Sequence, residues 1–285
     1  MPLAFDSAEE LCRSPQVDAV FITTPNACHL DDVRVAAACG KPILCEKPMA
    51  MSADQCREMV EAARNAGVLL GVAHVFRFEE STAWLRQQLS AGQIGTPVFA
   101  RSEFSFPASH GHARTWIHDP VIAGGGPVAD VGVHCIDTLR FILQDEILRV
   151  SAREIAGDSG EVEAGAALLL EFSRGTLATV TVSFLAEYRT PLELVGETGV
   201  LWADNALTVE HPIDLELRRG GTVVETHRVS NRLAYALQVD AFADAVEGKA
   251  AFPIPGEEGW RNQEVLDAAY RSMKSGQTEE VRKLG

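Results

Sequence analysis

Short apolar runs alternate with amphipathic stretches over the first 75 residues of the chain. The runs at 18–23, 42–45 and 68–73 predict buried strands, because turn residues bound them and they are too short for helices. Alanine-rich stretches at 27–39 and 52–66 predict the intervening helices, with Gly40 ending the first and Ser52 capping the second. This order predicts right-handed crossovers and a parallel sheet, which is half of a doubly wound domain.

After residue 74 the pattern changes to a two-residue alternation broken by a few helices. Helices are expected at 80–90, about 129–143, 232–247 and 257–275, and a long loop at 107–126. Strands are expected at 98–106, 147–155, 163–172, 175–185, 190–196, 199–203, 206–210, 214–219 and 222–227, with turns at Gly175, Gly199 and Gly220-Gly221. Consecutive strands with tight turns predict a large, mostly antiparallel sheet.

Composition and charge narrow the classes of function. With 285 residues, 46% hydrophobic and 23% charged, the chain is typical of a globular protein of one large or two modest domains. A formal net charge of -15 argues against nucleic-acid partners and anionic membranes. No apolar run approaches the roughly 20 residues of a membrane helix, and the first residues do not resemble a signal peptide. Six cysteines without a Cys-x-x-Cys pair favour reduced thiols in the cytoplasm.

Polar residues follow two of the predicted parallel strands. Thr23, Thr24, Pro25 and Asn26, with His29, follow the first strand, and Glu46, Lys47 and Pro48 follow the second. Parallel strands end at a common edge where open α/β sheets bind ligands, so these residues are candidates for cofactor binding. A lysine held beside a proline can hydrogen-bond a hydroxyl, and Glu46 could meet a ribose or the lysine. The alternatives are a turn capped by Asn26 with an exposed His29, and a solvated lysine.

A second cluster of candidate residues follows the run Gly124-Gly125-Gly126. Asp130 and His134 lie one helical turn apart, and Asp137 follows three residues later. Histidine suits general acid–base work, and Asp130 could orient it or hold a substrate hydroxyl. The three glycines would let the backbone approach a ligand. The alternative is a helix N-terminus with an acidic cap and a packed histidine.

Weaker candidates for substrate contact are Arg77, Trp116, His112 and Asp137. Arg77 could instead form a salt bridge, and Trp116 could instead pack in the core. His110 and His112 could suggest a zinc site with Asp130 and His134. Closely spaced loop histidines without helical spacing favour contact with solvent or substrate, so no metal is expected.

The ordered motifs at 19–29, 40–48 and 124–137 resemble those of the Gfo/Idh/MocA family, the relatives of glucose–fructose oxidoreductase and inositol dehydrogenase. The resemblance implies an incomplete Rossmann domain at 1–74 that binds NAD or NADP. It implies an α/β domain at 75–285, whose last helix can pack back on the first and whose open sheet forms homodimers or homotetramers. The implied activity is hydride transfer at a hydroxyl of a sugar, cyclitol or related polyol. Lys47 would touch substrate and nicotinamide ribose, and His134 would be the acid or base, assisted by Asp130.

The chain departs from this family in its N-terminal region. No strand with a Gly-x-Gly-x-x-Gly turn precedes Lys47, and a unit of about 55 to 60 residues is expected to be absent. Gly124, Gly126 and Ala129 fit the glycine pattern only formally, because no apolar strand leads into them and Pro127 interrupts them. Two other interpretations therefore stay open: an NAD-assisted glycoside hydrolase or lyase, and a truncated, non-catalytic binding or assembly protein.

Overall fold

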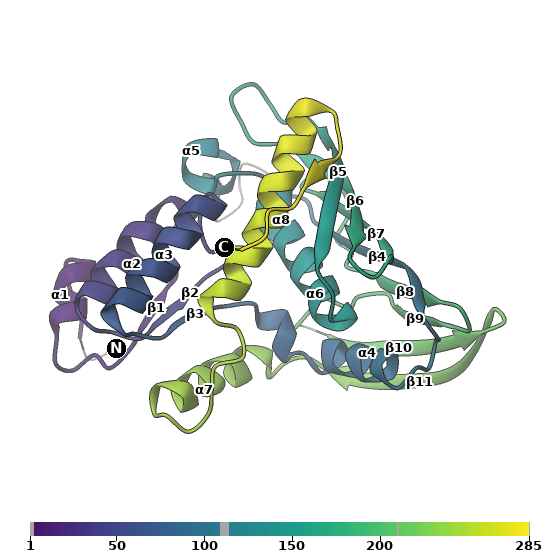
Figure 1. Ribbon diagram of the computed structural model, residues 1–285, viewed down its shortest axis with the longest axis horizontal. Helices are drawn as coiled ribbons and strands as arrows, with labels where there is room; N and C mark the ends of the chain where they lie inside the picture. Colours follow the sequence, from purple (N-terminus) through teal and green to yellow (C-terminus); the bar gives the residue numbers. More distant parts are fainter. Residues whose placement is uncertain (1–2, 109–113, 210, 285) are drawn as a thin grey trace.

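A computed structural model of the protein describes residues 3–108, 114–209 and 211–284. It contains a three-stranded sheet of order β1-β2-β3 and a nine-stranded sheet of order β11-β10-β9-β8-β4-β7-β6-β5-β12 (Figure 1). The first sheet is parallel, and the second is mostly antiparallel. The predicted fold class, an incomplete Rossmann-type sheet followed by a large open sheet, is confirmed.

The first sheet forms where short apolar runs alternate with helices, as predicted. Its elements are α1 (Ala8–Arg13), β1 (Val20–Ile22), η1 (Asn26–Cys28), α2 (His29–Ala38), β2 (Ile43–Cys45), α3 (Ala53–Ala66) and β3 (Leu70–Val72). Ser52 caps α3 by accepting from the backbone N–H of Gln55, and Gly67 ends it with a left-handed φ of 68°. Because β1 and β2 are parallel neighbours, the segments after them leave the sheet at the same edge.

The end of the chain covers the outer edge of this sheet at β3. Val72 N–H donates to the carbonyl of Ile254 at 3.0 Å, and Gly71 forms a bridge with Pro255. A side chain at position 71 would clash with the ring of Phe252, at 2.6 Å from its Cβ. The polar backbone of this edge is therefore paired rather than open, which removes a site for strand association.

The nine-stranded sheet follows the predicted alternation, with two corrections. It contains β4 (Pro97–Ser105), β5 (Ile147–Ile155), β6 (Gly165–Phe172), β7 (Leu177–Ser183), β8 (Leu192–Gly196), β9 (Val200–Ala203), β10 (Pro212–Arg219), β11 (Thr222–Ser230) and β12 (Glu279–Glu280). The strand expected at 206–210 is not formed within the described 206–209, where Ala206 N–H bonds to Thr190 O and buried side chains hold an irregular path. The short β12, which pairs with β5, was not predicted.

Among the described residues, the helices that pack on the large sheet lie on one of its faces. The helical elements after β3 are η2 (Val75–Phe78), α4 (Glu80–Ser90), η3 (Thr115–His118), α5 (Pro120–Ala123), the π-helical turn η4 (Val128–Gly132), α6 (Val133–Leu143), α7 (Ala234–Val246) and α8 (Gly256–Ser275). Helices α4, α6 and α8 lie on the same side of the sheet, and α8 also packs on α3 (Figure 1). The loop predicted at 107–126 was partly wrong, because Asp119 caps the short α5 through Val121 N–H.

A buried ion-pair network joins the segment after β3 to α6 and α8. Arg77 Nη2 lies 2.7 Å from Asp137 Oδ1 and 2.7 Å from Glu258 Oε2. Burial alone would raise the pKa of Asp137, but the Arg77 guanidinium together with Arg140 and His74 outweighs it and lowers that pKa below its usual range. His74 Nδ1 lies 3.7 Å from Asp137 Oδ2, and burial lowers the pKa of His74 to about 4.

In the described ranges, no helix is both long enough and apolar enough to cross a membrane.

We expect His74→Phe to reduce the acid sensitivity of the fold. The folded pKa of His74 is about 4 and its unfolded value about 6.5, so the unfolded state binds more protons between these values. Stability is therefore lost as pH falls from about 6.5 to 4, by at most about 3 kcal/mol for this group. Urea unfolding across that range should show a smaller loss in the variant, with the exposed His227→Phe as control. Equal losses in wild type and His74→Phe would contradict the assignment.

Candidate functional site

Side chains from the two sheet regions meet around the carboxylate of Asp130. Lys47, directly after β2, donates from Nζ to the Asp130 carbonyl at 2.9 Å and to Oδ1 at 3.3 Å. Arg114 donates from Nη1 to Oδ1 at 2.9 Å and from Nη2 to Oδ2 at 3.0 Å. Such a two-pronged arginine contact fixes the plane of the carboxylate as well as its position. Asp130 is thus held by two cations from different parts of the chain.

This arrangement keeps Asp130 ionised. The residue is only 8% exposed, and burial by itself would raise its pKa. Lys47 and Arg114 outweigh that effect and lower the pKa of Asp130 below its usual range. Asp130 therefore acts as a fixed negative charge beside Lys47 and is a poor proton acceptor.

His134 lies in the first turn of α6, against an aromatic wall. Its ring centroid is 4.5 Å from that of Phe76 and 6.1 Å from that of Phe104. Burial, followed by the nearby Lys47 ammonium, lowers the pKa of His134 well below its usual value, so the imidazole is neutral near pH 7. Its Nδ1 is buried without a hydrogen-bond partner among the described residues, so Asp130 does not orient the ring through that atom.

The predicted cofactor residues at the sheet edge are only partly accessible. Thr23 and Thr24 are exposed, Pro25 is half-buried, and the Thr24 hydroxyl donates to Asp32 Oδ2 at 2.7 Å. Glu46 is half-buried beside Lys47, and its Oε2 accepts from the Lys47 N–H at 3.2 Å. Burial raises the pKa of Glu46, and Lys47 partly opposes this.

Asn26, His29 and Pro48 are buried inside the protein, where they hold the two loops together. Asn26 Nδ2 donates to the carbonyl of Ala123 at 2.8 Å. His29 is fully buried, with Nε2 at 2.9 Å from Thr24 O and Nδ1 at 3.1 Å from Pro48 O. The alternative of an exposed His29 is therefore wrong. The geometry gives Asn26 and His29 the role of fixing the loops that carry the site.

The three glycines before Asp130 are closely packed by other parts of the protein at the place where a side chain would begin. A Cβ at Gly124 would lie 2.7 Å from Met51 Sδ, and the residue has a left-handed φ of 76°. A Cβ at Gly125 would collide with the hydroxyl of Tyr270, and one at Gly126 with the carbonyl of Glu163. The expectation that these glycines admit a ligand is corrected, because close packing against other segments accounts for all three.

The remaining candidates lie elsewhere or outside the described residues. Arg77 and Asp137 pair with each other in the buried network, which argues against substrate contact. Trp116 is half-buried and packs against the small cluster that contains Ile117 and Phe184. His112, like His110, lies outside the described residues. Within the described ranges no group of His, Cys, Asp and Glu is arranged to hold a metal ion.

Sequence reasoning missed Arg114, whose guanidinium holds the carboxylate of Asp130. Arg114 belongs to an irregular segment before η3, where no periodicity indicates the direction of a side chain.

Comparisons with known proteins agree with this architecture. Residues 1–74 match the family described as "Oxidoreductase family, NAD-binding Rossmann fold", and residues 82–202 match "GFO/IDH/MocA C-terminal domain". The chain is 33% identical to 1,5-anhydro-D-fructose reductase of Ensifer adhaerens, over 96% of this chain and 83% of that protein. It is 32% identical to D-xylose 1-dehydrogenase (NADP(+)) 2 of Haloferax volcanii, over 99% of this chain and 86% of that protein.

Solved structures share the same fold. The aldose–aldose oxidoreductase of Caulobacter crescentus, complexed with glycerol, has a TM-score of 0.87 at 24% identity, covering 95% of this chain and 82% of that one. Levoglucosan dehydrogenase in complex with NADH and levoglucosan has a TM-score of 0.85 at 19% identity, covering 98% and 84%. At these identities the likeness establishes the fold alone.

We expect Gly126→Ala to destabilise the protein, whereas Gly132→Ala in the same segment should not. The new Cβ at 126 meets a backbone carbonyl that cannot rotate away, so the cost should be about 1 to 3 kcal/mol or more. A Cβ at 132 would lie at ordinary contact distances of 3.5 Å, and its helical backbone should gain up to about 1 kcal/mol. Urea unfolding measures both changes; equal stabilities would contradict the packing described for Gly126.

Proposed function

The chain belongs to the Gfo/Idh/MocA family, and from this premise we propose that it is an NAD- or NADP-dependent oxidoreductase acting on a hydroxyl of a sugar, cyclitol or related polyol. The N-terminal match is to an NAD-binding Rossmann fold, which gives the class of cofactor. The substrate class is supported by relatives whose names specify anhydrofructose, xylose and inositol.

One observation carries the proposal: Lys47, from the first sheet region, bonds to Asp130, which lies one helical turn before His134. Lys47 Nζ reaches both the carbonyl and Oδ1 of Asp130, and its charge adds to burial in lowering the pKa of His134. A cation held at Asp130 and a neutral imidazole one turn further along are suited to bind one hydroxyl oxygen together. Neither group alone would distinguish a redox site from an ordinary polar cluster.

His134, Lys47 and Asp130 would each have a different role in the reaction of the substrate hydroxyl. A bound nicotinamide supplies the hydride acceptor or donor. His134, neutral because its pKa is lowered, takes the hydroxyl proton during oxidation and returns it during reduction. Lys47 donates a hydrogen bond to the same oxygen and stabilises the negative charge that develops there. Asp130, fixed by Arg114, holds Lys47 in place without taking the proton itself.

The residues at the sheet edge fit the nicotinamide end of the cofactor. Thr23, Thr24, Glu46 and Lys47 lie at the common carboxyl edge of β1 and β2, where open α/β sheets bind nucleotides. In the described part of the chain, the turns after β1 and β2 contain no glycine, so neither offers the close backbone approach that a diphosphate uses. Calorimetric titration with NAD⁺, NADP⁺ and NADH tests this: dissociation constants above about 1 mM, roughly -4 kcal/mol, would argue against the proposal.

We also propose that residues 1–74 and 75–285 are the cofactor and substrate units. The two sheets fall on either side of this boundary. The last part of the chain returns to the first unit, because Phe242, Phe252 and Ile254 complete its apolar core. The closing helix α8 spans both units and ties them together through Asp267, which accepts from the Ala53 N–H at 2.9 Å.

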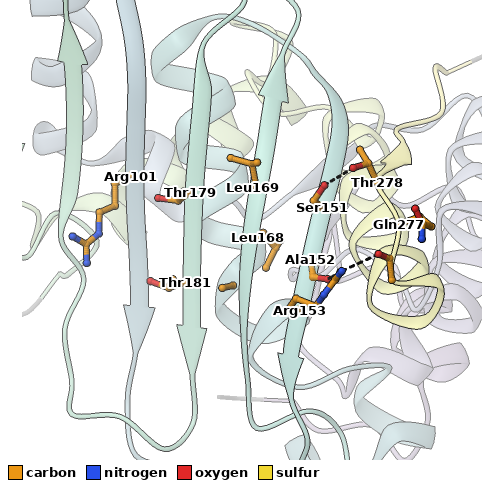
Figure 2. Close-up of a pocket in the computed structure, with 12 residues that line it drawn as sticks. Arg101, Ser151, Ala152, Arg153, Leu168, Leu169, Thr179, Thr181, Gln277 and Thr278 are labelled. Atoms are coloured by element: carbon orange, nitrogen blue, oxygen red, sulfur yellow. Dashed lines mark hydrogen bonds between the residues drawn. The ribbon is translucent and has the colours of Figure 1, made fainter.

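The uncovered face of the large sheet is proposed as the surface that joins two copies of the chain. It exposes Phe99, Leu169 and Leu177, which are 54%, 40% and 36% exposed. A shallow groove of about 760 Å³ crosses the strands β4, β7, β6 and β5, and its lining includes Arg101, Thr179 and Thr181 (Figure 2). Exposed apolar side chains together with polar and arginine side chains on one open face are typical of an interface between identical subunits.

His134→Ala and Lys47→Met should abolish most of the activity while the fold is retained. Loss of the acid–base group should lower kcat by about 10² to 10⁴-fold, and loss of the cation by about 10² to 10³-fold. Steady-state oxidation of cyclitols and aldoses with NAD⁺ or NADP⁺ gives the rates, and circular dichroism checks the fold. His227→Ala and Lys274→Ala, both on the surface, are the matched controls.

For Lys47→Met we also predict a change in the pKa of His134, which can be measured without turnover. Because the Lys47 ammonium lowers the pKa of His134, its removal should raise that pKa and move the onset of imidazole protonation to higher pH. An NMR titration of the imidazole resonances measures this. An unchanged His134 titration, or wild-type rates in both variants, would refute the assigned site.

Leu169→Asp should shift the protein toward monomers. A carboxylate in place of the exposed Leu169 on the open face would lose its hydration in a dimer, which is unfavourable. Light scattering after size-exclusion chromatography gives the mass of each variant. Val239→Asp on α7 places the same charge on an exposed apolar position away from this face and is the control. A monomeric wild type, or a dimer that persists in Leu169→Asp, would rule out this surface.

A further inference from the structure

We propose that Glu163, together with Tyr270, is a positioning pair that sets the location of Asp130 and His134 for the reaction. Glu163 lies in the loop between β5 and β6, and Tyr270 lies on α8. Neither belongs to the sheet edge or to the segment 124–137. The inference rests on the proposed function, because it concerns how these two residues act through Asp130 and His134.

The helical segment that carries the site has no cap of its own. It begins at Val128, and the residue at the capping position, Pro127, makes no side-chain hydrogen bond to its first turn. Glu163 supplies the missing acceptor from 35 residues further along the chain. Its Oε2 accepts from Gly126 N–H at 2.9 Å, and its Oε1 accepts from Val128 N–H at 3.1 Å. A carboxylate in this position also complements the positive end of the helix.

Tyr270 completes the arrangement from the opposite direction. Its hydroxyl donates to Glu163 Oε1 at 3.1 Å, so the carboxylate accepts from three donors and its orientation is determined. The same hydroxyl lies directly against Gly125, where any side chain would collide with it. The glycine segment is therefore enclosed between Tyr270 and Glu163, and it cannot shift without breaking at least one of these contacts.

Two hydrogen bonds connect Glu163 to the reacting groups. Gly126 donates its N–H to Glu163 and accepts the Asp130 N–H on its carbonyl at 2.9 Å. Asp130 in turn holds Lys47 and Arg114, and His134 follows four residues later. A change at Glu163 thus reaches Asp130 through a single residue, Gly126. The π-helical geometry of Val128–Gly132 makes this segment dependent on outside support, because such turns are rare and short.

The experiment compares Glu163→Gln, Tyr270→Phe and the double variant with wild type. An amide in place of the carboxylate turns an NH₂ group toward one of the backbone donors, so at least one hydrogen bond is lost. Tyr270→Phe removes a single hydroxyl and keeps the ring that fills the space. We expect kcat to fall by about 10- to 100-fold in Glu163→Gln and less in Tyr270→Phe, with KM for the cofactor changed by less than about threefold.

Glu264→Gln is the matched control for the substituted carboxyl group. Glu264 is also buried, lies on α8 like Tyr270, and accepts from Trp260 Nε1 at 3.2 Å, and in the described part of the chain it makes no hydrogen bond to the segment 124–134. The Glu264→Gln variant should lose stability, but its kcat should stay close to that of wild type. In a His134→Ala background, Glu163→Gln should produce a smaller further loss of rate than in wild type, because part of its effect passes through His134.

Two measurements separate this inference from the proposed function. The imidazole resonances of His134 should shift in Glu163→Gln and Tyr270→Phe, and not in Glu264→Gln, whether or not the chain turns over any substrate. A wild-type kcat in Tyr270→Phe and Glu163→Gln with unshifted His134 resonances would overturn the positioning role. So would an equal loss of rate in the wild-type and His134→Ala backgrounds. Shifted resonances in a protein without oxidoreductase activity would sustain the positioning and reject the function.

Discussion

The ionised carboxylate of Asp130 is the interaction on which the arrangement of the site depends. It is nearly inaccessible to water, so its charge must be compensated by the protein, and Lys47 and Arg114 provide that compensation from two different segments. Removal of either cation would leave a buried charge with one partner. The same contact fixes Lys47 at the boundary between the two sheets, where a lysine would otherwise be free to extend into solvent.

The segment that presents Asp130 owes its shape to packing that is distant in sequence. Gly124, Gly125 and Gly126 approach Met51, Tyr270 and Glu163 respectively, so one short stretch contacts three other parts of the molecule. The buried network of Arg77, Asp137 and Glu258 fixes the next turns of α6 to α8. Because both ends of this unit are held, the imidazole of His134 has little freedom to move relative to Lys47.

Local pattern was sufficient to predict the elements, and it could not predict the partners of buried polar groups. Lys47 and His134 were identified because one follows an apolar run at a sheet edge and the other belongs to a short motif with helical spacing. Arg114, Glu163 and Tyr270 carry no such signal, since their roles are set by contacts 16 to 107 residues away. Asp137 shows the reverse error: its spacing placed it with His134, but the nearby Arg77 determines what it binds.

Under the proposed function, the cations bound to Asp130 favour an alkoxide. Lys47 and Arg114 bring two positive charges to the single carboxylate of Asp130, while burial and Lys47 lower the pKa of His134 and keep the imidazole neutral. In that proposal, removal of a hydroxyl proton by His134 leaves an oxyanion near a cation. Glu46 lies beside Lys47 and opposes this effect in its ionised form, but burial raises its pKa. If Asp130 were bound to Lys47 alone, the carboxylate would offset the whole charge of that lysine. The proposal therefore gives Arg114 an electrostatic role: it offsets the charge of the carboxylate, so that Lys47 can act on the substrate oxygen.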